Sequence, residues 1–178
     1  MIPNLLSIFR VLSIFPIVIF FHIEAYILAT ILFLIASVTD FFDGYIARKF
    51  NQESNLGSLL DLLADKILVI SSLIWFIFIF DGFLILISAY LIIIREILIS
   101  SLRIHFLVLG NNLDQIKPNL LGKIKTTIQM IAISTVFISP YFNQEYILYA
   151  SIFLLVSAFI SVASLQNYYS LWSKKNEL

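Results

Sequence analysis

Residues 83–107 read FLILISAYLIIIREILISSLRIHFL, and this run decides the fold class. Its Asp, Glu, Lys and Arg residues are Arg95, Glu96 and Arg103, none of which comes before its midpoint. A helix that crosses the hydrocarbon core of a bilayer needs about 20 mostly apolar residues. Only a backbone with closed hydrogen bonding is stable there, and the run lacks the alternation of a barrel strand. The stretch therefore predicts a transmembrane helix.

The composition of the whole chain agrees with this prediction. Of 178 residues, 61% are hydrophobic and 12% are charged, and the mean hydropathy is +1.01. A water-soluble domain averages roughly half apolar and a quarter charged residues, so an all-α integral membrane protein is predicted. Eleven Lys and Arg balance eleven Asp and Glu, which gives no reason to expect a nucleic-acid partner. The absence of cysteine excludes thiol catalysis and disulfide bonds.

Apolar segments recur along the chain and predict six transmembrane helices. We treat residues 1–178 as a single six-helix transmembrane catalytic domain, with a short interfacial segment over residues 1–10. The expected spans are about 5–22, 25–48, 57–80, 83–107, 121–139 and 146–172.

The basic residues predict the orientation of these spans. The connections near 22–25, 81–82 and 140–145 contain no Lys or Arg. Positive charge is retained in the cytoplasm, so both termini are expected on the cytoplasmic side. The basic residues on that side are Arg10, Arg48, Lys49, Lys117, Lys123, Lys125, Lys174 and Lys175.

Four carboxylates lie in the cytoplasmic halves of two adjoining spans. Asp40 and Asp43 belong to the second span, and Asp61 and Asp65 to the third. Ionisable side chains at membrane depth are costly and tend to be functional or paired. Because the polar segment 49–56 that joins the two spans is short, we expect antiparallel neighbours whose acidic faces can meet.

Four carboxylates in one cleft of low dielectric constant would repel one another unless cations neutralised them. Oxygen ligands favour Mg²⁺ or Mn²⁺, and four aspartates can bridge two such ions about 4 Å apart, as in phosphoryl displacement. The alternatives are an ion-pair network, or a proton or cation pathway such as that of a small transporter. We give them little weight, because few basic residues lie nearby and the sequence shows no internal repeat.

The spacing of these residues resembles a known signature. Residues 40–48 read DFFDGYIAR, and Gly57, Asp61 and Asp65 follow at fixed intervals. All eight specified positions agree with the CDP-alcohol phosphatidyltransferase signature, D-x-x-D-G-x-x-A-R, x8, G-x-x-x-D-x-x-x-D. The resemblance implies a six-helix membrane fold and the transfer of a phosphatidyl group from a CDP-lipid to an alcohol, with release of CMP.

The resemblance also implies roles for the matching residues. Asp40, Asp43, Asp61 and Asp65 would hold two Mg²⁺ or Mn²⁺ ions. Asp65 matches the last aspartate of the signature and is the expected general base for the acceptor hydroxyl.

Further positions match residues that contact the CDP-lipid. Gly44 would allow close approach, and Arg48 would contribute charge; Ser54 and Asn4 are weaker assignments to the same pocket. Small residues such as Gly44 also permit close helix packing, and the two interpretations are compatible.

Basic residues of the fourth and fifth spans are candidates for binding the acceptor. Arg95 and Arg103 are eight residues apart, hence on nearly the same helical face, and Lys123 and Lys125 open the fifth span. Guanidinium groups bind phosphate oxygens well, so these four residues favour a phosphorylated acceptor. Attraction to lipid headgroups is the alternative role for the lysines.

Three stretches resemble the branch of the family that makes phosphatidylglycerophosphate. They are residues 3–10 (PNLLSIFR), residues 95–103 and residues 122–129 (GKIKTTIQ), with Ser7 in place of the usual threonine. This branch implies CDP-diacylglycerol and glycerol 3-phosphate as substrates, a homodimer, and a bacterial inner membrane with the active site facing the cytoplasm. A sibling enzyme that uses inositol phosphate, or phosphatidylglycerol to make cardiolipin, remains the alternative.

Overall fold

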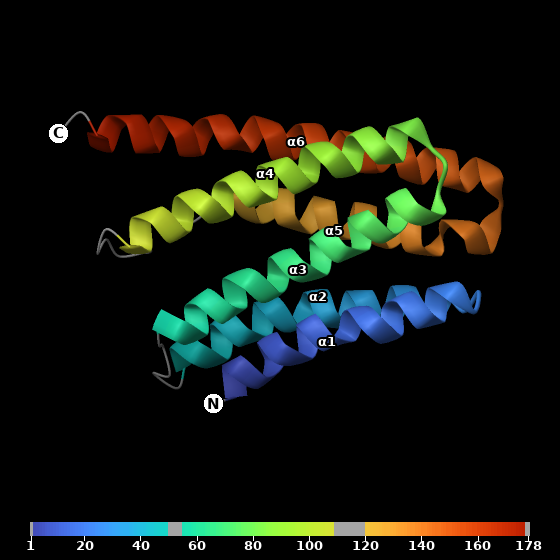
Figure 1. Cartoon of the computed structure of the whole chain (residues 1–178), viewed down its shortest axis with the longest axis horizontal. Helices are drawn as coiled ribbons and strands as arrows, with labels where there is room; N and C mark the ends of the chain where they lie inside the picture. The colour runs from blue at the N-terminus through green and yellow to red at the C-terminus, as the bar shows by residue number, and fades with distance from the viewer. Residues whose placement is uncertain (1, 50–54, 109–119, 177–178) are drawn as a thin grey trace.

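The computed structural model is all-helical over the residues that it describes, which are 2–49, 55–108 and 120–176, with side chains described in 6–39, 63–102, 104 and 124–164. The bounds of the helices, labelled in Figure 1, are α1 (Ile2–His22), α2 (Tyr26–Lys49), α3 (Asn55–Ile79), α4 (Phe83–Val108), α5 (Leu120–Phe142) and α6 (Gln144–Asn176). Each helix coincides closely with one of the six segments expected from the sequence.

Two helices are long and apolar enough, by length and composition, to cross a membrane. Among the described residues these segments are Phe83–Leu102 in α4 and Gln144–Ser164 in α6. Shorter apolar segments, Leu6–His22 and Tyr26–Thr39, lie in α1 and α2. The all-helical fold is therefore confirmed, whereas the number of spans stays a prediction.

The prolines do not end the helices in which they lie. α1 is continuous from Ile2 to His22 and includes Pro16, so residues 2–10 belong to the same helix as the first expected span. α5 likewise continues past Pro140 to Phe142. Transmembrane helices tolerate proline because neighbouring groups satisfy the freed backbone carbonyls.

Local hydrogen bonds define two of the tight turns. After α1, the Ala25 amide donates to the Phe20 carbonyl at 2.8 Å and the Glu24 amide donates to the Phe21 carbonyl at 3.1 Å. This pair of bonds is a Schellman motif, in which Glu24 takes a left-handed φ of 63°. Before α6, the side chain of Asn143 accepts a bond from the Tyr146 amide at 3.2 Å and caps the helix.

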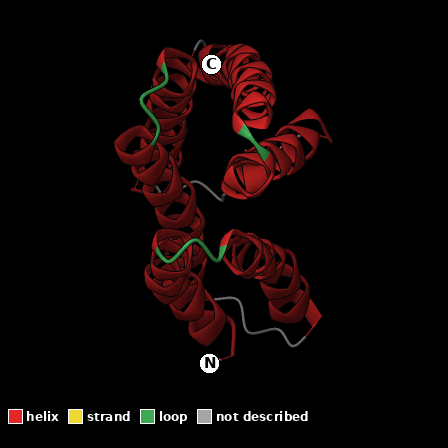
Figure 2. Cartoon of the chain, turned by 90° about the vertical axis from the view of Figure 1, so that its right-hand side faces the viewer, coloured by secondary structure: helices red, strands yellow, loops and turns green. Residues whose placement is uncertain are grey.

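The helices form a closed ring in the order α1, α2, α5, α6, α4, α3, in which each helix contacts the next and α3 returns to α1 (Figure 2). α2 and α3 also touch across the ring, as expected for the pair that carries the signature. The start of α1 and the end of α6 lie at the same end of the bundle (left in Figure 1). The ends of α2 and α4 and the starts of α3 and α5 lie there too, so this end gathers the basic segments.

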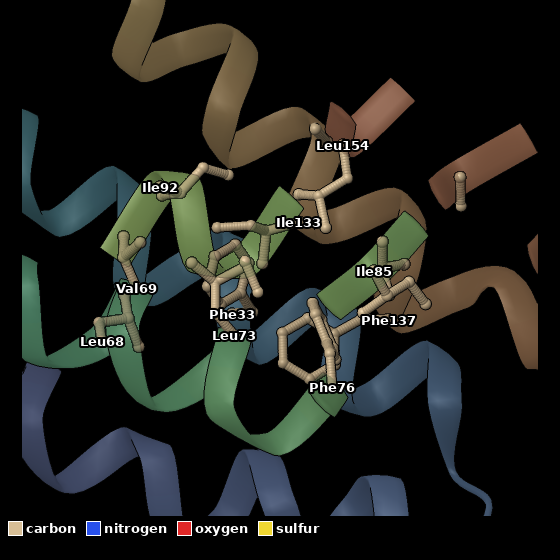
Figure 3. Close-up of a cluster of buried hydrophobic side chains, with 14 of the residues drawn as sticks. Phe33, Leu68, Val69, Leu73, Phe76, Ile85, Ile92, Ile133, Phe137 and Leu154 are labelled. Carbon is tan, nitrogen blue, oxygen red and sulfur yellow. The ribbon is translucent and has the colours of Figure 1, made fainter. Parts of the chain in front are cut away.

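Buried apolar side chains fill the middle of the ring, and Figure 3 shows Phe33, Phe76 and Phe137 among them. Phe137 of α5 lies at the centre, with its ring centroid 4.6 Å from that of Phe76, 5.2 Å from Phe33 and 5.8 Å from Phe21. Each such pair is worth about 0.5–1.5 kcal/mol beyond the area that it buries. These rings fix the relative positions of α1, α2, α3 and α5.

The surface of the bundle is apolar, and buried charges lie inside it. Exposed large side chains include Phe15, Phe78, Phe83 and Phe159, with Phe78 78% exposed. Arg10 of α1 is fully buried, and Arg95, Glu96 and Lys125 of α4 and α5 are buried. An apolar exterior around a charged interior is the arrangement expected of a membrane protein.

Candidate active site

Glu96 is the centre of an ion-pair cluster within the bundle. Its side chain is 1% exposed, and its two oxygens receive different donors. Oε1 accepts hydrogen bonds from Arg95 Nη1, at 2.9 Å, and from Lys125 Nζ. Oε2 accepts a hydrogen bond from Lys66 Nζ. Three cations from α3, α4 and α5 therefore meet on one carboxylate.

Burial explains why these partners are needed. An isolated charge in an apolar interior is costly, and breaking a buried pair costs about 3–5 kcal/mol because the remaining charge has no compensation. Side-chain exposure is 6% for Arg95 and 2% for Lys125. The contacts of Glu96 thus join α3, α4 and α5 at one level of the bundle.

Arg95 extends the cluster to α6. Its Nη2 donates a hydrogen bond to Ser164 Oγ at 2.9 Å. The Ser164 hydroxyl donates in turn to the carbonyl of Ser161 at 2.6 Å, which fixes its oxygen as an acceptor facing Arg95. One guanidinium therefore spans from Glu96 of its own helix to the neighbouring helix.

Asp65 lies beside this cluster, and one of its carboxylate oxygens accepts no hydrogen bond from the described residues. Its Oδ2 is 3.7 Å from Lys66 Nζ, within ion-pair range but beyond a hydrogen bond. Its Oδ1 is buried and has no hydrogen-bond partner in the described part of the chain. A buried carboxylate oxygen left without a donor is unusual. Such an oxygen fits a hard divalent cation, which binds oxygen ligands.

We refer to Asp65, Lys66, Arg95, Glu96 and Lys125 together as the charged cluster. Asp65, Lys66, Glu96 and Lys125 lie in the half of their helices nearer the end of the bundle that holds the two chain termini, and Arg95 lies at the middle of α4. The cluster therefore lies between the middle of the bundle and the end for which the sequence predicts the active site.

The predicted site residues divide into two groups. Asp65, Arg95 and Lys125 have described side chains, and Arg95 and Lys125 meet on Glu96. The side chains of the others lie outside the described residues, although their backbones, except that of Ser54, belong to the helices. These others are Asn4 in α1, Asp40, Asp43, Gly44 and Arg48 in α2, Asp61 in α3, Arg103 in α4, Lys123 in α5, and Ser54.

The same limit applies to the predicted metal site. Among the described side chains, no group of three or more His, Cys, Asp or Glu residues could hold a metal ion. Asp65 is the single member of the predicted quartet with a described side chain. That the acidic faces of α2 and α3 meet thus remains a prediction.

Sequence reasoning missed two members of the charged cluster, Lys66 and Glu96. The available signal was charge at membrane depth: Glu96 interrupts an apolar run, and Lys66 follows Asp65 directly. Buried charges need partners, so these residues could have been paired with each other. The helix arrangement that brings Lys125 to the same carboxylate could not be predicted from the sequence.

Comparison with known proteins gives the family. Residues 1–163 match the family described as CDP-alcohol phosphatidyltransferase. A Wigglesworthia glossinidia brevipalpis protein is 42% identical over 135 residues, which are 74% of this chain and 74% of that protein. Proteins from Salmonella choleraesuis and Shigella flexneri are each 35% identical over 172 residues, which are 95% of this chain and 93% of each protein.

All three relatives are named CDP-diacylglycerol–glycerol-3-phosphate 3-phosphatidyltransferase. The family match covers the whole signature, the charged cluster and most of α6. On this match, together with the helical fold and the buried charges, the chain belongs to the CDP-alcohol phosphatidyltransferase family.

Proposed function

We propose that this protein transfers the phosphatidyl group of CDP-diacylglycerol to glycerol 3-phosphate, giving phosphatidylglycerophosphate and CMP. The names of its relatives and the extent of the family match support this reaction. One structural observation carries it furthest. Lys66 touches both Asp65, the last aspartate of the signature, and Glu96, on which Arg95 and Lys125 converge. The Lys66 ammonium group therefore lies between a residue of the CDP-lipid signature and the residues proposed to bind the acceptor alcohol.

In this reaction the primary hydroxyl of glycerol 3-phosphate attacks the lipid-proximal phosphorus. A new oxygen–phosphorus bond forms, the bond to CMP breaks, and the hydroxyl proton passes to Asp65. This role rests on the match of Asp65 to the last aspartate of the signature, since a general base must lie within reach of the proton that it takes.

The proposed metal site consists of Asp40, Asp43, Asp61 and Asp65, holding two Mg²⁺ or Mn²⁺ ions. The orphaned Oδ1 of Asp65 fits a hard cation, and the other three aspartates rest on the signature. Bound ions of this kind neutralise phosphate charge and stabilise the attacking and leaving oxygens. Asn4, Gly44, Arg48 and Ser54 are the proposed contacts to the CDP-lipid.

The proposed acceptor site consists of Arg95, Arg103, Lys123 and Lys125, which bind the phosphate of glycerol 3-phosphate. Glu96 holds Arg95 and Lys125 side by side, which supports a common ligand for them. Three cations against two carboxylates leave the charged cluster with an excess of positive charge. That excess favours an anion.

The membrane arrangement that we propose has six spans and both termini in the cytoplasm. The position of the two chain ends at one end of the bundle, together with the basic segments, supports it. A bacterial inner membrane, an active site open to the cytoplasm and a homodimer follow from the family branch.

The test is an assay of CMP release by the purified protein in lipid nanodiscs. CDP-diacylglycerol is supplied with glycerol 3-phosphate, inositol phosphate or phosphatidylglycerol, with Mg²⁺, with Mn²⁺ and with EDTA. We expect glycerol 3-phosphate to be the preferred acceptor and EDTA to abolish release. Preference for either other acceptor would replace the substrate assignment, and turnover in EDTA would refute the metal site.

A further inference from the structure

Lys66 lies between two carboxylates and bonds to only one of them. Its Nζ donates to Glu96 Oε2, whereas Asp65 Oδ2 is 3.7 Å away. Residues adjacent in a helix do not face each other, so the ammonium of Lys66 turns toward α4 and Glu96. A shift of roughly 1 Å would bring the same nitrogen within hydrogen-bond distance of Asp65.

Glu96 is therefore in competition with Asp65 for one cation. Glu96 holds Lys66 with Oε2, while its Oε1 is already occupied by Arg95 and Lys125. Without the negative charge of Glu96, the nearest described carboxylate left to Lys66 is that of Asp65. An ammonium bonded to Asp65 Oδ2 would place a positive charge beside Oδ1 and would repel a divalent cation there.

We propose that Glu96 is a positioning residue that keeps Lys66 off Asp65 and so leaves Asp65 available to a divalent cation. This inference rests on the proposed function, because it takes Asp65 to be a metal ligand. It adds a second task to the charged cluster. Besides binding Arg95 and Lys125, the Glu96 carboxylate fixes where the positive charge of Lys66 lies relative to a cation bound at Asp65.

The test measures Mn²⁺ binding to the full-length protein in nanodiscs by the loss of the free-ion electron paramagnetic resonance signal. Glu96→Gln removes the charge with little change of shape. We expect it to weaken Mn²⁺ binding roughly tenfold or more, by analogy with the change of about tenfold or more that one nearby charge makes to the proton affinity of a carboxylate. Glu145→Gln, in an exposed residue at the start of α6 and so at the other end of the bundle, should bind as the wild type does.

Two double variants separate positioning from a general loss of packing. Lys66→Met in the Glu96→Gln background removes the competing ammonium and should restore Mn²⁺ binding. Lys125→Met in the same background removes another cation of the same cluster, which relieves charge repulsion without freeing Asp65. It should not restore binding. If Glu96→Gln does not fold, Glu96→Asp takes its place, because it draws the carboxylate away from Lys66 by one methylene; it should weaken Mn²⁺ binding, and Lys66→Met in that background should restore it.

The possible outcomes are distinct. If the wild type binds no Mn²⁺, the metal site of the proposed function is wrong and this inference falls with it. If the wild type binds Mn²⁺ and Glu96→Gln binds equally well, only the positioning role is refuted. The role is also refuted if both double variants recover binding, or if neither does, since then Lys66 has no special part in the loss.

Discussion

Arg95 Nη2 donates a hydrogen bond to Ser164 Oγ at 2.9 Å, across 69 residues of sequence. This contact links the charged cluster, whose residues belong to α3, α4 and α5, to α6. It also orients the guanidinium whose other nitrogen bonds to Glu96. The proposed acceptor site thus depends on a helix that carries none of its charged residues.

Replacing Ser164 with alanine should therefore impair acceptor binding. A hydrogen bond to a charged group is worth about 1.5–3 kcal/mol, and Arg95 would lose one that holds its orientation. We expect Ser164→Ala to raise the KM for glycerol 3-phosphate while the KM for CDP-diacylglycerol changes little. Ser157→Ala is the control, because that buried hydroxyl donates to the Leu154 carbonyl of its own helix. Equal effects of the two substitutions would contradict the prediction.

Asp65→Asn should abolish turnover and leave CDP-lipid binding measurable. General-base catalysis contributes roughly 10²–10⁴-fold to rate, and the amide has lost the basic oxygen while keeping the shape of the side chain. The measurements are CMP release and equilibrium binding of a labelled CDP-lipid. Asp81→Asn, in an exposed residue between α3 and α4, is the matched control. Turnover retained within a few fold of wild type would show that Asp65 is not the base.

Arg103→Ala should weaken the use of glycerol 3-phosphate more than binding of the CDP-lipid. Loss of one charged hydrogen bond of about 1.5–3 kcal/mol corresponds to a KM that rises roughly tenfold or more. Lys49→Ala serves as the control, because that residue is assigned only to the basic residues that set the orientation of the spans. A parallel loss for both substrates would rule out a dedicated acceptor role for Arg103.

Phe137→Ala should destabilise the bundle. The Phe137 ring touches rings from α1, α2 and α3, and its removal leaves a cavity where four helices meet. Deleting such a ring costs about 3–5 kcal/mol, which denaturation in detergent followed by circular dichroism would measure. Phe78→Ala, at a side chain that is 78% exposed, should change stability little. Similar losses from the two variants would show that Phe137 is not central to packing.

The helices could be predicted from the sequence because each is set by its own apolar run and by the breaks around it. The segment expected over 83–107 is α4 (Phe83–Val108), and α2 and α3 are in contact as their short connection implies. The closed ring, in which α5 lies between α2 and α6, could not be predicted. Apolar helices in lipid carry no strong pattern that selects neighbours, so packing of small and aromatic side chains decides the order.

The candidate site, too, could be predicted only in part from the sequence. The spacing of the signature identified Asp65, and the charge of Arg95 and Lys125 marked them for an anion. Their common partner Glu96 was not identified, because a pair of adjacent opposite charges such as Arg95 and Glu96 can be satisfied within one helix. Only the three-dimensional arrangement shows that Lys66 and Lys125 arrive from other helices.

The three short turns impose a mechanical asymmetry on the bundle. Three residues separate α1 from α2, three separate α3 from α4, and Asn143 alone separates α5 from α6, all at the end opposite the chain termini. Helices fastened pairwise at one end can splay apart only at the other. We therefore expect a lipid substrate with two acyl chains to enter at the end where the chain termini lie, because the tight turns hold the other end closed. The hydrogen bonds of Glu96 limit how far α3, α4 and α5 can separate.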